Sequence, residues 1–519
     1  MPTFAAIDIG SNSCRLKIAS VVQHKLKTLH EDREVTRLGE SVFQTGVISP
    51  ESMAGTIKAL KRFHKAVQVH VVDKVRVVAT SAMRDARNAA AFTEWVKSAT
   101  GWNVEVISGL EEGRLIHLGV VTHEEGAQGK CLLIDLGGGS CEVTFSDGGR
   151  VKAMVSLPLG AVRLQQEFLQ NDPATKEDAG RLRQYIDREL RKADRKLGKP
   201  EVDLVIATSG TAAALAEASA AIEVKTPAKK VAPKAFVRVK PMEALTPNVR
   251  KLADRLLKMT NEQRAAVPGV GPRRSEIIVG GAEVYATILT RMGLKGFRYS
   301  PLGLRDGMLA QMLGEVDLRG SVHQRIESER WAGVIELCRR YGIDEVKAEP
   351  VRQHVRQLFD SLAKVHELPP EYKLWLEAAA MMQEAGKFMN HQGHYRHSQY
   401  IIANSEIFGF SPEQRSVVSA IARYLGKSRP DPMDRVMRTL PIEEHARVVR
   451  AVVLLRLAMA LNQDRATAAV KVKTHVYPKR VVMDLVPVRG GAELEAWSLK
   501  KEAAYFREVF RRELFVDVA

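Results

Sequence analysis

A nine-residue motif occurs twice in this chain, as AIDIGSNSC at residues 6–14 and as LIDLGGGSC at residues 133–141. In each copy an apolar run reaches an aspartate, Asp8 or Asp135, then a turn of small residues follows and an alternating run resumes. This pattern predicts a strand, a tight turn and a second strand, made twice. Small turn residues let backbone N–H groups converge on an anion, and an aspartate at a strand end can hold a divalent cation. Two such loops facing each other would grip a chain of phosphates from both sides.

The composition is that of an ordinary globular protein with a strong positive charge. The 519 residues exceed what one core accommodates, so several domains are expected. Lysine and arginine number 78 against 61 aspartates and glutamates, a net charge of +17. Such a surplus predicts an anionic partner, namely nucleic acid, a membrane surface or a polyphosphorylated substrate, although a generally basic protein fits the charge equally well.

Cysteine usage and the start of the chain indicate a cytoplasmic protein. The four cysteines show neither CxxC nor zinc-site spacing, so we expect buried thiols in a reducing compartment. The first residues lead directly into a predicted strand, which leaves no room for a signal peptide. No run of 18 apolar residues occurs, so no membrane span is expected.

Residues 1–125 and 126–310 repeat one order of strands and helices around the two motifs. Repeated order with a repeated loop predicts a duplicated α/β domain with a cleft between its halves. The expected elements are helices near 52–67, 89–100, 111–121 and 176–196, and strands at 75–80, 104–107, 153–158 and 204–207.

The character of the sequence changes after the second half. Residues 311–465 carry helical periodicity almost throughout, which predicts an all-helical domain. Residues 466–519 contain two strand-like runs, 470–476 and 480–485, and a final helix near 494–514, so we expect a small α/β appendage. A Lys/Ala/Pro-rich stretch at 225–234 predicts an exposed basic loop.

Spacing argues against the other common phosphate cradles. The chain has no GxxxxGK[ST] motif and no GxGxxG after its first strand, and a strand rather than a helix follows each loop. Two further small-residue turns, 80–84 and 207–211, follow predicted strands and would add donors, unless they serve only as helix caps.

The segment SGLEEGR at 108–114 opens a helix, where glutamates usually complement the helix dipole. A cleft lined by anion donors, however, needs a carboxylate to orient or deprotonate water.

In combination these motifs resemble the exopolyphosphatase and guanosine pentaphosphate phosphatase family. The resemblance covers roughly residues 4–310 and continues into the helical region at 395–410. The segments that carry it are Asp8–Ser13, Thr80–Arg84, Ile107–Glu112, Ile134–Ser140, Ser209–Thr211 and Pro301–Gly307.

The resemblance implies an actin-like, ribonuclease H-type ATPase fold for the first two domains, with the site in the interdomain cleft. By the family pattern Glu112 would be the catalytic base. Phosphate would be bound by Ser11, Asn12, Ser13, Gly137, Gly138, Gly139, Ser140, Ser209, Gly210 and Thr211. Nucleotide or polyanion contacts would come from Arg15, Arg84, Arg273 and Arg274, and Mg²⁺ ligands from Asp8, Asp135 and Glu142. Much of the family is dimeric, which implies a homodimer.

The helical region resembles an HD-type metal phosphohydrolase domain and departs from its pattern at one place. Where a working HD domain has His-Asp, this chain has Gln383 and Glu384. Glutamine is a poor ligand for a catalytic divalent metal, so no second active site is expected. The histidines of this region are then expected to be relics, surface groups or anion contacts: His354, His391, His394 and His397.

The sequence therefore predicts a cytoplasmic, Mg²⁺-dependent exopolyphosphatase. A basic helix is expected to guide the polymer through eight cations: Arg181, Arg183, Arg188, Arg191, Lys192, Arg195, Lys196 and Lys199. The nearest alternative is a guanosine pentaphosphate 5′-phosphohydrolase that forms guanosine tetraphosphate. A kinase or chaperone-like ATPase on the same fold and a non-catalytic polyphosphate or alarmone sensor are more remote alternatives. No nucleic-acid or membrane partner is expected.

Overall fold

Both copies of the repeated motif form the predicted β-hairpin. The first joins β1 (Thr3–Ile9) to β2 (Ser13–Val22), and the second joins β6 (Cys131–Leu136) to β7 (Cys141–Asp147), each as an antiparallel pair. The same backbone hydrogen bond closes each turn, with N···O distances of 3.2 Å from Gly10 to Ser13 and 2.9 Å from Gly137 to Ser140. The prediction of a strand, turn and strand made twice is confirmed.

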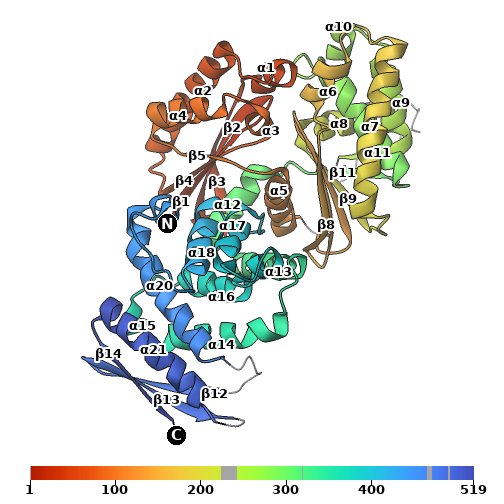
Figure 1. The fold of residues 1–519 in the computed structure, drawn as a ribbon. Helices are drawn as coiled ribbons and strands as arrows, with labels where there is room; N and C mark the ends of the chain where they lie inside the picture. The colour runs from red at the N-terminus through yellow and green to blue at the C-terminus, as the bar shows by residue number, and fades with distance from the viewer. Residues whose placement is uncertain are drawn as a thin grey trace. The chain divides into compact units, whose positions relative to one another are not determined.

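The computed structural model divides into two compact units, residues 1–325 and 326–519 (Figure 1). It describes residues 2–124, 126–223, 242–317, 320–463, 470–488 and 491–518. The predicted basic loop at 225–234 lies outside these ranges. No helix within them is long and apolar enough to cross a lipid bilayer. The finer division at residues 125, 310 and 465 stays a prediction.

The first unit contains two sheets with one shared topology. The first sheet has the order β3-β2-β1-β4-β5 and the second β10-β11-β9-β6-β7-β8. In both, the hairpin continues on one side into a third antiparallel strand and pairs on the other with a parallel strand. The strands that complete the sheets are β3 (Lys25–Val35), β4 (Lys74–Ala79), β5 (Val104–Val106), β8 (Arg150–Leu157), β9 (Leu204–Thr208), β10 (Glu243–Leu245) and β11 (Gly296–Tyr299). Strand β3 was not predicted.

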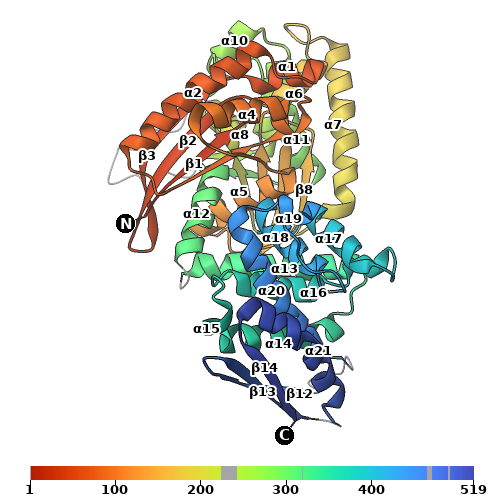
Figure 2. The same ribbon diagram turned by 60° about the vertical axis from the view of Figure 1, so that its left-hand side comes forward.

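Helices cover both faces of each sheet and share one layer between the sheets (Figures 1 and 2). The outer face of the first sheet packs on α2 (Pro50–Val69) and α4 (Ala89–Thr100), and its inner face on α5 (Gly109–His123) and α12 (Leu304–Val316). The inner face of the second sheet contributes to the same α5–α12 core. Its outer face is covered by α6 (Ala161–Phe168), α7 (Lys176–Leu197), α8 (Ser209–Glu223), α9 (Thr246–Leu257) and α11 (Ile278–Arg291). The short helices of this unit are α1 (Leu38–Thr45), α3 (Ser81–Asp85) and α10 (Asn261–Ala265).

The alternation of side chains along β1 explains why helices cover both faces of the first sheet. In β1, Ala5 and Ile7 belong to the outer core while Phe4 and Ala6 belong to the inner one. Successive side chains of a strand point to opposite faces, so a strand that is apolar at every position needs helices on both sides. Every one of these side chains is almost fully buried.

Helices α5 and α12 approach each other through glycines. A Cβ on Gly307 of α12 would stand 1.7 Å from the carbonyl oxygen of Leu115 of α5, and one on Gly119 would stand 2.7 Å from the Gly307 nitrogen. Only hydrogen fits at such a contact, so the backbones of the two helices lie against each other. This crossing sets the position of α5, whose first turn carries Glu112.

The second unit is a helical domain with a small sheet, as predicted. Its helices are α13 (Ser321–Arg340), α14 (Glu345–Ser361), α15 (Ala363–His366), α16 (Tyr372–Met382), η1 (Ala385–Phe388), α17 (His394–Asn404), α18 (Pro412–Arg423), α19 (Arg435–Arg438) and α20 (Ile442–Ala460). The sheet pairs β12 (Val470–Val476) with β13 (Arg480–Pro487), and β13 with β14 (Glu513–Val518), while α21 (Glu493–Phe510) connects β13 to β14. Helices and sheet share one continuous apolar core.

The predicted final helix, 494–514, is wrong at its C-terminal end. Helix α21 ends at Phe510, and Arg511 adopts a left-handed backbone conformation with φ of 55°. From there the chain continues as β14, in which Leu514 and Val516 are buried while Phe515 is half exposed. The apolar residues after the helix alternate with period two, which is the strand pattern.

We predict that Gly307→Ala destabilises the first unit, because its methyl group would overlap the backbone of α5. Overpacking of this kind costs about 1–3 kcal/mol or more. Gly55→Ala is the matched control, since Gly55 lies on the exposed face of α2 and a methyl group there would meet only open space. That control should stabilise by about 0.4–1 kcal/mol. Urea unfolding of both variants would measure the difference, and equal stabilities would contradict the glycine crossing.

Candidate active site

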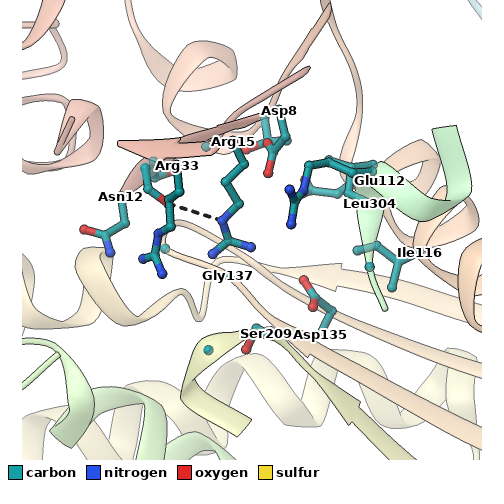
Figure 3. Close-up of a pocket in the computed structure, with 18 of the residues that line it drawn as sticks. Asp8, Asn12, Arg15, Arg33, Glu112, Ile116, Asp135, Gly137, Ser209 and Leu304 are labelled. Carbon is teal, nitrogen blue, oxygen red and sulfur yellow. Dashed lines mark hydrogen bonds between the residues drawn. The ribbon is translucent and has the colours of Figure 1, made fainter. Parts of the chain in front are cut away.

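A cavity of about 420 Å³ in the first unit lies between the two hairpins (Figure 3). Walls come from both hairpin loops, from the first turn of α5 and from the start of α12. Most of the sequence-predicted residues line it together: Asp8, Ser11, Asn12, Ser13, Arg15, Glu112, Asp135, Gly137, Gly138, Gly139, Ser140, Ser209, Gly210 and Arg274. The structure thus gathers residues from five separate segments into one space.

Four predicted residues do not line this cavity. Arg84 and Glu142 lie behind the wall and contact residues that do line it, as described below. Thr211 is buried on α8, where it packs against Gly281 of α11. Arg273 is exposed, next to the lining residue Arg274.

The two glycine- and serine-rich loops touch each other. A Cβ on Gly138 would lie 3.0 Å from the Cβ of Ser11 and 3.2 Å from the backbone nitrogen of Asn12. Glycine at this position is what allows the approach, since a side chain would separate the loops. The loops therefore form one continuous wall.

The backbone of both loops is oriented with its N–H groups available for an anion. The carbonyl oxygens of Ser11 and Asn12 accept hydrogen bonds from residues 36–39, and those of Gly138 and Gly139 accept from residues of α6. Among the described residues, the N–H groups of these same four residues make no hydrogen bond. Carbonyls held from outside and unpaired N–H groups produce a concave donor surface that suits phosphate.

Glu112 is a buried carboxylate that binds Arg84 and has a raised pKa. Its side chain lines the cavity, and Arg84 donates to its Oε2 at 3.0 Å. Arg84 also donates to the Ile107 carbonyl at 2.9 Å and to Ser140 Oγ at 3.3 Å. Burial raises the pKa of Glu112 to about 7, against the opposing charge and hydrogen bond of Arg84. A carboxylate with this pKa exchanges protons at neutral pH, as a general base must.

A second buried glutamate lies next to the first. Glu142 accepts a hydrogen bond from Ser156 Oγ at 2.7 Å, and its other oxygen has no hydrogen-bond partner among the described residues. Burial raises its pKa well above the usual range, and the negative charge of Glu112 adds to the effect. Strand register places Glu142 opposite Asp135, whereas the corresponding position opposite Asp8 is Arg15. The duplicated hairpins therefore differ in charge at matching positions.

Asp8 and Asp135 point into the cavity from opposite walls (Figure 3). Burial raises the pKa of both carboxyls, and negative charge nearby adds to the crowding: Asp8 acts on Asp135, and both act on Glu112. Thr208 Oγ1 donates to Asp135 and fixes its orientation. Two neighbouring carboxylates of this kind can act as oxygen ligands for a small hard cation.

Glu142 fits such a cation less well, because it does not line the cavity. Within the described ranges, no group of three or more His, Cys, Asp or Glu side chains is arranged to hold a metal ion. Mg²⁺ commonly uses one or two carboxylates and completes its shell with water and phosphate oxygens. The Asp8–Asp135 pair satisfies that smaller requirement.

Four arginines line the opposite part of the cavity, and the sequence analysis identified only two of them. They are Arg15, Arg33, Arg274 and Arg305. Burial lowers the pKa of Arg33 and of Arg274 to about 10, and the charge of Arg15 contributes to both shifts. None of the four forms an ion pair within the described part of the chain. Partly shielded cations that repel one another and form no ion pair predict an anionic ligand.

Arg33 and Arg305 were missed for different reasons. Arg33 lies on β3, a strand that sequence analysis did not predict, in a run of consecutive charged residues typical of a solvated surface. Arg305 stands inside the quoted Pro301–Gly307 motif, at the start of α12, and that position was a usable signal. Its Nη1 donates to the Leu16 carbonyl at 2.9 Å, which holds the side chain against β2.

The predicted basic helix is α7, and most of its charge is neutralised locally. Five of its eight cations form ion pairs. Arg183, for example, binds Glu283 of α11 and Asp254 of α9 at 2.8 and 2.7 Å. Only Arg195, Lys196 and Lys199 make no ion pair with a described residue. The helix is thus mainly a packed element with paired charges rather than a continuous cationic track.

The histidines of the helical domain are dispersed. His354 is buried on α14, where burial lowers its pKa to about 4, and His394 and His397 lie on α17. His391 is exposed before α17. Gln383 and Glu384 follow α16, and Gln383 is buried.

Comparison with known families agrees with the site. The model of the Ppx/GppA phosphatase family matches residues 17–316, and that of Ppx/GppA phosphatase domain III matches residues 330–506. The chain belongs to the Ppx/GppA phosphatase family. It is therefore a hydrolase of the phosphatase class, and the resemblance noted in the sequence is confirmed.

Three solved structures are similar to this chain over 59–62% of its length. A family member from Aquifex aeolicus is 33% identical, with a TM-score of 0.50, over 62% of this chain and 99% of that protein. An exopolyphosphatase from Cytophaga hutchinsonii is 26% identical, with a TM-score of 0.54, over 60% and 98%. An exopolyphosphatase-like protein is 28% identical, with a TM-score of 0.54, over 59% and 96%. The predicted actin-like ATPase fold is confirmed together with the helical domain and small C-terminal sheet.

We predict that Glu112→Gln increases stability at alkaline pH and leaves it unchanged at acidic pH. The folded-state pKa of Glu112 is raised above its unfolded value, so its contribution is favourable below about pH 4.5 and is lost as the pH rises through about 7. Glutamine mimics the protonated acid and avoids this loss, which corresponds to about 1–3 kcal/mol at pH 8. Calorimetric melting at about pH 4 and about pH 8 measures it.

The control for this experiment is Glu94→Gln, which alters an exposed carboxylate on α4. Its effect should be the same at both pH values. A pH-independent effect of Glu112→Gln as well would contradict the burial-driven shift.

Proposed function

We propose that this phosphatase is an exopolyphosphatase, which removes orthophosphate from the end of inorganic polyphosphate in the cavity between the two hairpins. The proposal rests on the combination of a base, hydrogen-bond donors and cations that line this one cavity. A buried base with a pKa of about 7, a wall of unpaired N–H donors and four unneutralised arginines face one space. A substrate with several consecutive phosphates uses all of these groups at once. Two of the similar solved structures are described as an exopolyphosphatase and an exopolyphosphatase-like protein.

In this proposal Glu112 accepts a proton from the attacking water. Arg84 holds the Glu112 carboxylate through the 3.0 Å hydrogen bond and keeps part of it ionised at neutral pH. The N–H groups of Ser11, Asn12, Gly138 and Gly139 then face the equatorial oxygens of the terminal phosphate, where negative charge accumulates during in-line displacement. The arginines bind the phosphates that follow and retain the shortened chain.

We further propose that Asp8 and Asp135 hold Mg²⁺. Bound there, the ion would supply charge neutralisation for the transferred phosphoryl group and the leaving oxygen. The carboxylates themselves act as ligands, and the hydrogen bond from Thr208 keeps Asp135 turned toward the cavity.

A guanosine pentaphosphate 5′-phosphohydrolase is the second candidate. Tyr299 lines the same cavity and lies close enough to Arg274 for the charge of each to act on the pKa of the other. An aromatic ring beside arginines can stack on a nucleobase whose phosphates extend toward the loops. Comparison of kcat/KM for long-chain polyphosphate and guanosine pentaphosphate decides between the two. A ratio in favour of the nucleotide would replace the first candidate by the second.

We predict that Glu112→Gln lowers kcat for phosphate release from polyphosphate by about 10²- to 10⁴-fold, with KM nearly unchanged. The base is lost while the phosphate-binding groups remain. Glu111→Gln is the matched control, because Glu111 is the neighbouring residue of the same helix and binds Arg114 at 2.8 Å instead of lining the cavity. Phosphate release should persist in that control. Equal activity of Glu112→Gln and wild type would refute the mechanism.

We predict that Arg84→Gln moves the acidic limb of the pH–rate profile to higher pH. In the free wild-type enzyme kcat/KM should rise with pH through about 7, as Glu112 becomes ionised. Removing the Arg84 charge withdraws an interaction that lowers the pKa of Glu112, so the limb should shift upward. A profile of kcat/KM from about pH 5 to about pH 9.5 measures the shift. An unshifted or downward-shifted limb would show that another group controls it.

A further inference from the structure

Two cavities in the second unit share one aromatic side chain, Tyr395 of α17. The first, of about 320 Å³, lies among α14, the α16–η1 junction and the end of α20, and its polar lining residues are Lys347, Gln383, Glu384, Tyr395, Asn462 and Gln463. The second, of about 410 Å³, lies between the start of α17 and the end of α18. Because Tyr395 lines both, the cavities adjoin.

The first cavity combines apolar walls with a buried acceptor that has no partner. Val351, Leu425 and Met459 supply the apolar surface. Gln383 is 6% exposed, and its Oε1 makes no hydrogen bond within the described residues. A buried carbonyl oxygen without a donor is costly, and a ligand N–H would satisfy it. Six of its ten lining residues are polar and four are apolar, so the cavity suits a heterocyclic ring that carries N–H donors.

The second cavity is cationic. Its lining includes Arg396, His397, Arg423 and Lys427, and none of these forms an ion pair within the described ranges. Some other arginines of this unit have carboxylate partners: Arg352 and Arg356 share Glu377, and Arg456 binds Glu502. Unpaired cations gathered around one hollow suit phosphate oxygens.

The ring of Tyr395 is held at the junction by a glycine. A Cβ on Gly426 would lie 2.9 Å from Cδ2 of Tyr395, so the ring rests directly on the backbone of the second cavity. Leu425, the preceding residue, lines the first cavity. One short segment thus contributes to the first cavity on one side of the ring and to the cationic cavity on the other.

We propose that the two cavities form a single site for a purine nucleotide, with the base in the first cavity and the phosphates in the second. Guanine suits the first cavity best, because its ring and exocyclic N–H groups lie side by side and can donate to Gln383 Oε1 and to the Glu384 carboxylate, which also pairs with Lys387. The site is independent of the proposed hydrolysis, since every residue in it belongs to the second unit and the catalytic cavity belongs to the first.

The test measures GDP binding to the full-length protein by calorimetry. Arg15→Ala and Arg274→Ala are introduced to weaken nucleotide binding in the hydrolytic cavity. In this background GDP should bind saturably, and tripolyphosphate, which has no base, more weakly. Gln383→Met should weaken GDP binding at least about tenfold, because the acceptor is lost while the length of the side chain is kept. Gln399→Met is the matched control, because Gln399 lies on α17 and lines neither cavity, and it should leave binding unchanged.

A second variant keeps the test decisive if Gln383→Met fails to fold. Arg423→Gln with Lys427→Gln alters side chains at the cavity rim and should weaken GDP much more than guanosine. Absence of saturable GDP binding would overturn the proposal, as would unchanged GDP affinity in the rim variant. Tripolyphosphate binding as tight as GDP binding would indicate an anion site without a base pocket and would overturn it too. None of these outcomes depends on phosphate release.

Discussion

The close crossing of α5 and α12 is the constraint on which the active site depends. The two helices form the only layer that both sheets of the first unit share within the described residues, and they meet through Gly119 and Gly307 with no side chain between them. Because α5 begins at Gly109, this contact places its first turn at the mouth of the space between the hairpins. The catalytic carboxylate proposed here is thus positioned by backbone packing more than by its own hydrogen bonds.

Separation of charge within one cavity follows from this arrangement. Carboxylates of Asp8, Glu112 and Asp135 and the guanidinium groups of four arginines line the same space. No ion pair joins the two sets within the described residues, although the charges of Arg15 and Arg305 oppose the rise in the pKa of Asp8. Burial raises the pKa of the acids and lowers that of Arg33 and Arg274. Each set is unfavourable alone, and a substrate that brings phosphates, with a cation, relieves both. Binding of such a substrate would therefore lower the electrostatic free energy of both sets.

Much of the fold was predictable because it depends on local patterns. The hairpins follow from an aspartate and small residues between apolar runs, and α4, α7 and α16 follow from apolar periodicity. Strand β3 was not predicted because its many charged residues, four of them consecutive, look like a solvated surface, and with it Arg33 was missed. The end of α21 was misplaced because a left-handed residue, Arg511, and a short strand interrupt a run whose composition is otherwise helical.

The sequence by itself determined the duplicated hairpins, the change to a helical domain after the second half, and the residue types of the site. Only the tertiary structure decided which charges stay unpaired. Four of the five ion-paired cations of α7 find a carboxylate within the same helix, but Arg183 finds its carboxylates 100 and 71 residues away, on α11 and α9. The four cavity arginines find none in the described chain and remain available for an anion. Ion pairing is decided by distance in space, and a linear pattern carries no information about charges that approach from distant segments.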